Sequence, residues 1–165
     1  MKLLVPYVPS KLRPETIEAL QADGLEPDYR LCEGDQGYWQ VLASVWGHCR
    51  DDLVIVEHDI VVNPGSVSEL VECPEHWCVF PYEYLDDHYG VGLGCVKFSR
   101  WLQARADNLM QRVGDASRDR MHPQKHWCRL DILIAGEVRA WHLSRHIHQP
   151  PVGHISDGRP SHGCI

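Results

Sequence analysis

Short apolar runs alternate with amphipathic segments along this chain, and each run predicts a buried strand. The strands are expected at residues 2–8, 29–32, 53–56, 77–80, 95–98 and 146–148. Apolar residues that recur at helical spacing predict helices at residues 14–22, 38–49, 66–72, 99–113 and 126–136. A further extended segment is expected at residues 138–141. Strands that alternate with helices indicate an α/β domain, with a mostly parallel central sheet flanked by helices.

Local signals set the limits of these elements. Ser66 and Ser99 each precede an amphipathic run, and both are predicted to be N-caps. From Gly153 onward the chain is rich in glycine, serine, proline and aspartate, so it is expected to be loose. We therefore expect one compact domain at residues 1–155 and a loose tail at residues 156–165.

Composition and charge exclude several classes of protein. The 165 residues carry a net charge of −7 without any lysine–arginine block, so the electrostatic signature of a nucleic-acid binder is missing. No apolar run approaches the roughly 20 residues that span a membrane. The opening MKLLVPYVPS is interrupted by Pro6 and Pro9, and we interpret it as a strand rather than a signal peptide. The seven cysteines form no CxxC pair, which favours small buried residues in a reducing, cytoplasmic setting.

The clearest candidate site follows the apolar run at residues 53–56, which leads directly into Glu57-His58-Asp59. Ligands of parallel sheets bind at the carboxyl ends of strands. In an extended chain Glu57 and Asp59 project to one side and His58 to the other. A divalent cation would relieve the repulsion between the carboxylates and hold a diphosphate, and oxygen ligands suit Mg²⁺ or Mn²⁺. The alternative is a solvated acidic turn.

The segment LVIVEHDIVV at residues 53–62 resembles the acidic Asp-x-Asp-type segment of GT-A fold, nucleotide-sugar-dependent glycosyltransferases, the nearest type being family 2. LLVPYVP resembles their first strand, and HWCRLDILI resembles their helix with the catalytic carboxylate. The resemblance spans residues 1–155 and implies one GT-A-like, Rossmann-related domain. The chain departs from the pattern at Glu57, which replaces an aspartate, and at Leu130, which precedes Asp131 where an acidic pair is expected.

The resemblance implies a metal-dependent enzyme, hexosyltransferase-like, that moves a sugar from a nucleotide-sugar donor to an unknown hydroxyl acceptor. UDP-sugars are favoured over GDP-sugars. Asp59 would bind the metal, Glu57 would face the ribose or the metal's outer shell, and Asp131 would be the general base. Leu130, Ile132 and Trp127 would supply the apolar setting that raises the pKa of Asp131. The nucleotide sugar would contact Pro6, Tyr7, Val8, His58 and Glu33, with Asp28 as an alternative to Glu33.

Histidines gather near the C-terminus in WHLSRHIHQPPVGH. Histidine is the commonest transition-metal ligand, and the resemblance implies that a C-terminal histidine completes the metal site. His148 is our first choice, with His146 and His154 as reserves. Together with carboxylates, histidines favour Mn²⁺ over Mg²⁺. The alternatives are half-exposed residues on an edge strand, or a structural zinc site, against which the lack of paired cysteine spacing argues.

Other interpretations stay open at this point. The same acidic site would suit a nucleotidyltransferase or a phosphohydrolase, and a non-catalytic metal- or sugar-binding module is the third class. The glycines at residues 90, 92 and 94 resemble a phosphate loop, but no helix follows them directly, so we expect them to allow a close backbone approach instead. The acceptor is not identified, and a homo-oligomer remains open.

Overall fold

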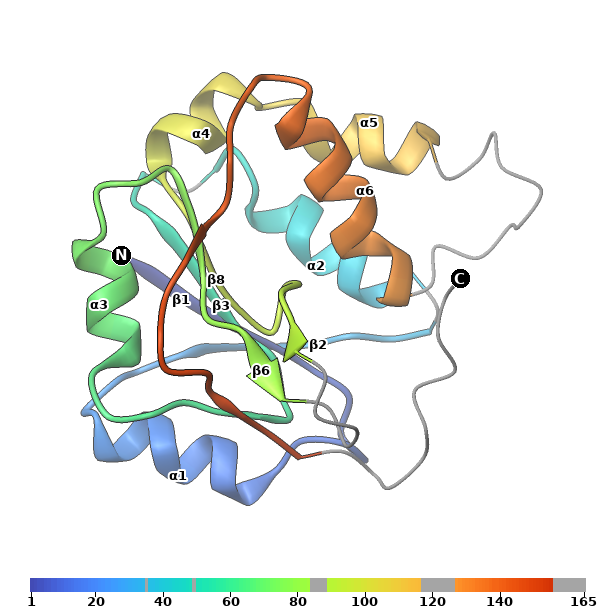
Figure 1. Ribbon diagram of the computed structural model, residues 1–165. Coiled ribbons are helices and arrows are strands. Elements are labelled where there is room, and N and C mark those ends of the chain that lie inside the picture. The colour runs from blue at the N-terminus through green and yellow to red at the C-terminus, as the bar shows by residue number, and fades with distance from the viewer. Residues whose placement is uncertain (35, 49, 84–88, 117–126, 156–165) are drawn as a thin grey trace.

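The computed structural model describes residues 1–34, 36–48, 50–83, 89–116 and 127–155. Its centre is a six-stranded sheet with the order β2-β1-β3-β8-β5-β9 (Figure 1). Along the sheet the strands are β2 (Asp28–Leu31), β1 (Lys2–Tyr7), β3 (Leu53–Val56), β8 (Cys95–Phe98), β5 (Trp77–Val79) and β9 (His146–Ile147). Two small sheets pair β4 (Ile60–Val61) with β10 (Gly153–His154), and β6 (Tyr82–Glu83) with β7 (Tyr89–Gly90). The helices are α1 (Pro14–Ala22), α2 (Gly37–Val45), α3 (Ser66–Glu72), α4 (Arg100–Arg105), α5 (Leu109–Ala116) and α6 (Trp127–Arg139).

The central sheet is mostly parallel, as the sequence predicts. Strand β1 pairs in parallel with both β2 and β3, and β5 pairs in parallel with β9. Only β8 runs against its neighbours, since it is antiparallel to β3 and to β5. The strands other than β8 therefore end at one edge of the sheet, where an α/β fold places its ligands.

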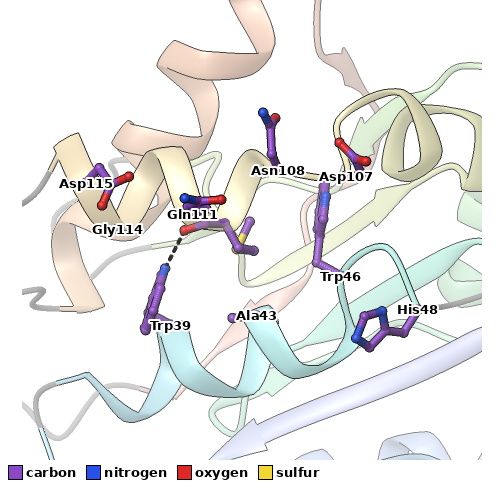
Figure 2. A pocket seen from close by; sticks show the side chains of 10 residues that line it. Trp39, Ala43, Trp46, His48, Asp107, Asn108, Gln111, Gly114 and Asp115 are labelled. Carbon is purple, nitrogen blue, oxygen red and sulfur yellow. Dashed lines mark hydrogen bonds between the residues drawn. The ribbon is translucent and has the colours of Figure 1, made fainter.

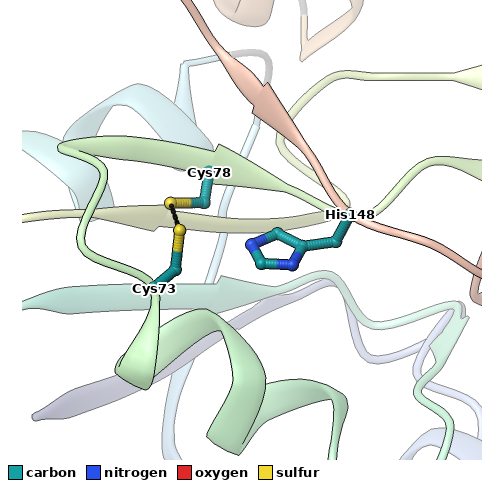
Figure 3. A group of neighbouring side chains, drawn as sticks. All are labelled: Cys73, Cys78 and His148. Atoms are coloured by element: carbon teal, nitrogen blue, oxygen red, sulfur yellow. Dashed lines mark hydrogen bonds between the residues drawn. The ribbon is translucent and has the colours of Figure 1, made fainter.

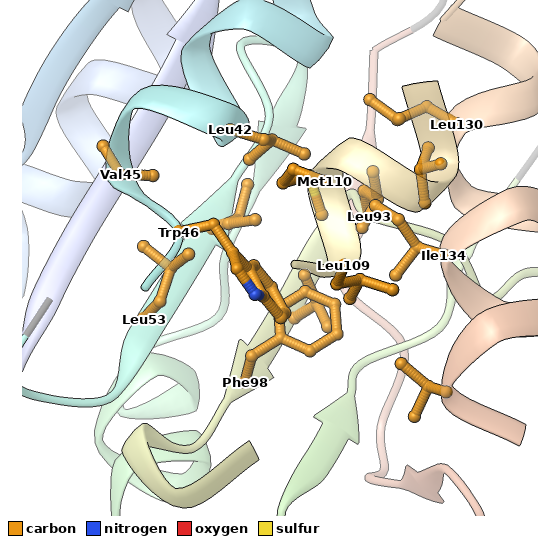
Figure 4. Packing of buried hydrophobic residues seen from close by; sticks show 14 of the residues in the cluster. Leu42, Val45, Trp46, Leu53, Leu93, Phe98, Leu109, Met110, Leu130 and Ile134 are labelled. Atoms are coloured by element: carbon orange, nitrogen blue, oxygen red, sulfur yellow. The ribbon is translucent and has the colours of Figure 1, made fainter. Parts of the chain in front are cut away.

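Helices cover both faces of the sheet, with α1 and α3 on one face and α2, α5 and α6 on the other (Figure 1). This layering explains why all four residues of β3 are buried. Leu53 and Ile55 join the core beneath α2, α5 and α6, whereas Val54 and Val56 join the core beneath α1 and α3. In the first of these cores Trp46 packs edge-on against Phe98, with ring centroids 5.1 Å apart (Figure 4).

The segment predicted as one helix at residues 99–113 forms two helices. Ser99 caps the first one as predicted, because its hydroxyl accepts a hydrogen bond of 3.1 Å from the Leu102 amide. The chain then leaves helical geometry at Ala106 and starts α5 at Leu109. The carbonyl of Ala106 accepts a hydrogen bond of 2.7 Å from Trp46 Nε1, so this break is tied to the chain that follows α2.

Three other element boundaries differ from the sequence-based expectation. The helix expected at residues 38–49 ends at Val45, where Trp46 turns extended. Ser66 is the first residue of α3 rather than its cap, because Gly65 precedes it with a φ of 81° that favours glycine. The extended segment expected at residues 138–141 is wrong, since α6 continues through Arg139 and buries Val138 in the core.

The C-terminal part of the described chain is more ordered than its composition predicts. Gly153–His154 forms β10 and pairs antiparallel with β4, with His154 opposite Ile60. The expectation of a loose chain from Gly153 onward is therefore wrong at these residues, and the tail expected at residues 156–165 lies outside the described residues. This pairing carries His154 to the chain that follows β3.

Candidate active site

The acidic segment after β3 forms a turn. The amide of Ile60 donates a hydrogen bond of 3.1 Å to the carbonyl of Glu57, and this closes the turn over His58 and Asp59. The extended geometry expected for this segment, with His58 pointing away from Asp59, is wrong. His58 Nε2 lies 3.8 Å from Asp59 Oδ2 instead.

His58 links the acidic turn to the end of β1. Its ring is buried, and Nδ1 lies 3.3 Å from the carbonyl oxygen of Pro6. The tautomer with the proton on Nδ1 satisfies that contact and leaves a lone pair on Nε2, on the side of Asp59. Burial lowers the pKa of His58, which favours this neutral form.

His154 approaches the same carboxylate from β10. Its Nε2 lies 3.5 Å from Asp59 Oδ2, and the amide of Ile155 donates a hydrogen bond of 2.8 Å to the Asp59 carbonyl. Burial acts to raise the pKa of Asp59, but the hydrogen bond from His154 and the proximity of the His58 and His154 rings outweigh it and lower the pKa overall. Asp59 is therefore an ionised carboxylate beside two imidazoles.

Glu57 behaves differently from Asp59. Burial and the neighbouring charges of Asp59 and Asp131 raise the pKa of Glu57 to about 8, although a hydrogen bond from Tyr38 partly offsets them. Tyr38 comes from α2 and is itself buried. One proton thus stays on Glu57 at neutral pH until a positive charge enters the site.

The raised pKa of Glu57 makes stability depend on pH. Between the ordinary value of 4.5 and about 8, folded Glu57 keeps a proton that the unfolded chain releases, so stability falls as pH rises through this window. In Glu57→Gln the side chain does not titrate, so its stability does not fall in this pH window. The amide oxygen still accepts the hydrogen bond from Tyr38. At pH 8 we expect the free energy of unfolding of the variant to be about 4 kcal/mol above that of the original protein. At pH 4.5 the two should be equal.

Urea unfolding with a chelator present, at both pH values, measures this difference. The comparison with the variant removes the contribution of the other titrating groups, which both proteins share. If the free energies of unfolding of the two proteins differ by the same amount at both pH values, Glu57 titrates normally.

Asp131 reaches the same site from α6. Burial raises its pKa, against a lowering effect of the Ile132 amide, which donates a 2.7 Å hydrogen bond to Oδ1, and of the charge of Arg145. Leu130 is buried as expected, but Ile132 is 55% exposed and does not form the apolar setting. The side chain of Trp127 lies outside the described residues. Asp131 lies close enough to Glu57 for its charge to act on that carboxyl group, and its catalytic role stays a prediction.

Gly92 explains part of the glycine pattern at residues 90–94. A Cβ atom at Gly92 would lie 2.7 Å from Asp131 Oδ2 and 2.8 Å from the Tyr82 hydroxyl oxygen. Real Cβ contacts are longer, so glycine lets the Asp131 carboxylate and the Tyr82 hydroxyl approach the backbone here. The Tyr82 ring in turn lies 5.7 Å from the His154 ring, which links Asp131 to the acidic turn.

Sequence reasoning missed three side chains of this site, Tyr38, Tyr82 and Arg145. The Arg145 guanidinium donates a hydrogen bond to the Val91 carbonyl, lies 5.1 Å above the Trp77 ring and interacts with the Asp131 charge. An arginine within the histidine-rich segment was the available signal for it. The two tyrosines stand on α2 and β6, and no local pattern marks them.

The residues predicted to bind the nucleotide occupy the carboxyl ends of β1 and β2. The Pro6 carbonyl contacts His58, and the Tyr7 ring packs edge-on against Tyr29 at 6.3 Å. Val8 lies partly buried against the core, while Glu33 is exposed just after β2.

Asp28 does not fit its predicted place. It begins β2 rather than ending it, and it forms ion pairs with Lys2 at 2.9 Å and with Arg30 at 2.7 Å. Its register places it level with Leu4, so the expectation that it ends the second strand is wrong, and its contact with base or ribose stays a prediction.

The histidines of the C-terminal segment separate into different places. His154 contacts Asp59, whereas His148 is buried with Nδ1 2.7 Å from Glu69 Oε1 and its ring stacked on Phe80 at 4.9 Å. His146 is exposed on β9, and its ring lies edge-on to that of His148 at 4.7 Å. Among the contacts that the described residues make, His154 rather than our first choice His148 meets the acidic turn.

The residues present at the acidic turn fit a divalent cation. Asp59 Oδ2 faces imidazole nitrogens of His58 and His154, and Glu57 holds a carboxyl group whose proton a cation would displace. Oxygen and imidazole ligands together suit Mn²⁺.

A pocket of about 540 Å³ lies elsewhere, between α2 and α5 (Figure 2). Trp39 and Trp46 form its apolar wall, and Trp39 Nε1 donates a 2.8 Å hydrogen bond to the Met110 carbonyl. Polar side chains, among them Asp107 and Gln111, line its other side. The lining does not include Glu57, Asp59 or Asp131, so this pocket is separate from the acidic turn.

Comparison with known proteins supports the fold. The chain is similar to the crystal structure of a glycosyltransferase involved in the glycosylation of the major capsid of PBCV-1, with 13% identity and a TM-score of 0.52 over 90% of this chain and 81% of that one. It is also similar to A197 from STIV, with 12% identity and a TM-score of 0.59 over 95% and 87%. The GT-A-like fold expected from the sequence is thereby confirmed.

Comparisons at the level of sequence give no relative. No family model matches the chain, and no curated protein matches it.

None of the helices that the structure describes has the length and apolar character needed to cross a membrane.

Proposed function

We propose that this protein is a metal-dependent glycosyltransferase that moves a sugar from a nucleoside-diphosphate sugar to a hydroxyl acceptor. The observation that carries the proposal is the meeting of Glu57, Asp59 and Asp131 at the carboxyl end of β3, close enough for Asp59 and Asp131 to raise the pKa of Glu57. The fold shared with a known glycosyltransferase supports the same conclusion.

Asp59 and His154 are the proposed metal ligands, with Glu57 beside them. Mn²⁺ bound there would offset the charge of the departing diphosphate. Asp59 is suited to this role because the two imidazoles already keep its carboxylate ionised. His58 holds the turn against the Pro6 carbonyl, so the end of β1, where we place the nucleotide, stays fixed to the metal site.

Asp131 is the proposed general base. Its raised pKa lets its carboxylate accept the proton of an acceptor hydroxyl group, whereas an ordinary surface aspartate is a weaker base. Arg145 lies near enough to interact with its charge and would keep the carboxylate oriented. Tyr82, which shares the backbone approach at Gly92 with Asp131, would line the path of the acceptor.

Mass spectrometry of donor turnover tests the proposal. The purified protein is incubated with a panel of UDP- and GDP-sugars, with Mn²⁺, with Mg²⁺ or with a chelator. We expect slow release of free sugar and nucleoside diphosphate with Mn²⁺, fastest for a UDP-sugar, and none with the chelator. Pyrophosphate or nucleoside monophosphate as products would indicate a nucleotidyltransferase or a phosphohydrolase instead. No donor breakdown with any metal would indicate a binding module.

A further inference from the structure

A second group of metal-ligating side chains lies away from the acidic turn. Cys73 follows α3, Cys78 stands on β5, and His148 follows β9 (Figure 3). One ligand atom from each lies within 4.8 Å of the other two. No step of the proposed glycosyl transfer uses these residues, and they come from three separate elements of the fold.

The orientation of His148 points to a ligand. Nδ1 lies 2.7 Å from Glu69 Oε1, while Nε2 is buried and has no hydrogen-bond partner among the residues that the structure describes. The residue is only 7% exposed, so water does not easily satisfy this nitrogen. Figure 3 shows the ring directed toward the two sulfur atoms. A carboxylate that holds one imidazole nitrogen while the other faces a metal is the usual arrangement at metal-binding histidines.

The two sulfur atoms lie close together beside a buried positive charge. The Sγ atoms of Cys73 and Cys78 lie 3.0 Å apart. Lys97 is almost completely buried beside them, and its ammonium group donates a hydrogen bond to the Cys73 carbonyl. The Lys97 ammonium group also lies 3.9 Å from Asp52 Oδ2, and thiolates beside it would add further negative charge to this buried cation.

We propose that Cys73, Cys78 and His148 bind a zinc ion, with Glu69 orienting His148. Two sulfur ligands and one nitrogen ligand are typical of zinc, whereas Mn²⁺ and Mg²⁺ prefer oxygen. A tetrahedral ion with Zn–S bonds of about 2.3 Å separates its sulfur ligands by about 3.7 Å, so a shift of less than 1 Å opens the pair. Binding displaces the two thiol protons, and a water completes the tetrahedron.

This site would fasten the C-terminal segment to the sheet. His148 lies six residues before His154, which contacts Asp59. A zinc ion that joins α3, β5 and this segment would hold the path that leads to β10. The zinc proposal does not rest on the proposed function, since it requires only the three ligands and Glu69.

Metal content is the first test. The protein is purified from zinc-supplemented medium under reducing conditions and analysed by inductively coupled plasma mass spectrometry. We expect about one zinc per chain, loss of zinc in Cys73→Ser, and full zinc in Cys32→Ser, another buried free cysteine. Asp59→Ala should also keep its zinc. Absence of zinc in the original protein, a Cys73–Cys78 disulfide in its place, or zinc retained in Cys73→Ser would overturn the proposal.

Glu69 allows a test that leaves the ligands intact. Glu69 is half-exposed, so Glu69→Gln should fold normally, and Glu72→Gln on the same helix is the matched control. Stripped protein is titrated with Co²⁺, whose thiolate charge-transfer band reports sulfur ligation. We expect binding to weaken by about 10- to 100-fold in Glu69→Gln and to stay unchanged in Glu72→Gln. Equal affinities in both variants, or no charge-transfer band in the original protein, would contradict the site.

Discussion

Asp59→Ala is expected to abolish metal-dependent nucleotide binding while the fold survives. Asp59 offers the carboxylate oxygen that both His58 and His154 approach, so alanine removes the proposed central ligand of the metal. Its side chain belongs to neither hydrophobic core, so the loss of stability should be about 1 kcal/mol. Isothermal titration of UDP in the presence of Mn²⁺ measures the effect, and we expect a loss of ~100-fold or more in affinity.

The matched control for Asp59→Ala is Glu18→Ala, which removes an exposed carboxylate from α1. It changes the net charge equally and should bind UDP and Mn²⁺ as the original protein does. Circular dichroism of both variants checks that they are folded. Unchanged binding in Asp59→Ala would move the metal site away from the acidic turn.

Asp131→Asn should separate binding from chemistry. The amide keeps the size of the side chain and its position beside Gly92, but it cannot accept a proton from an acceptor. General-base catalysis contributes roughly 10²- to 10⁴-fold, so turnover should fall by about that factor while the affinity for UDP and Mn²⁺ stays the same. Donor turnover by mass spectrometry and titration of UDP measure the two quantities.

Glu137→Gln is the control on the same helix, because Glu137 pairs with Arg112 at 2.5 Å and takes no part in the site. Its turnover should match that of the original protein. If Asp131→Asn turns over the donor at the original rate, Asp131 has no catalytic role, although the metal and nucleotide site would stand.

The strands were predictable because their signal is local. A strand covered by helices on both faces is continuously apolar, so β3 was identified to the residue, and β8 was as well although Lys97 interrupts its apolar run. Boundaries set by distant contacts were not predictable. The end of α4 at Arg105 goes with a hydrogen bond from Trp46 to Ala106, and the pairing of β10 depends on β4, far away in sequence.

In the candidate site, too, residues with a local signal were predictable and residues placed by distant contacts were not. Glu57 and Asp59 could be found because they follow directly on a buried strand. The choice among the histidines could not be made, since it depends on β10 pairing with β4, which places His154 and not His148 opposite Ile60. Tyr38 joins the site through the packing of α2, which no pattern within its own segment reveals.

The cysteine group was missed for a related reason. Cys73 and Cys78 are separated by four residues rather than two, so they lack the spacing that suggests a zinc site. Their third partner, His148, is distant in sequence and reaches them because β9 pairs in parallel with β5 at the edge of the sheet. Only the folded chain brings the three together.

Calorimetric titration of UDP into the original protein, with and without Mn²⁺, tests the central claim most directly. We predict that UDP binds measurably with Mn²⁺ present and at least tenfold more weakly with a chelator, because the diphosphate needs the cation at Asp59. The same UDP concentration should raise the thermal midpoint only when Mn²⁺ is present. An absence of nucleotide binding with Mn²⁺, for UDP and for GDP alike, would contradict it.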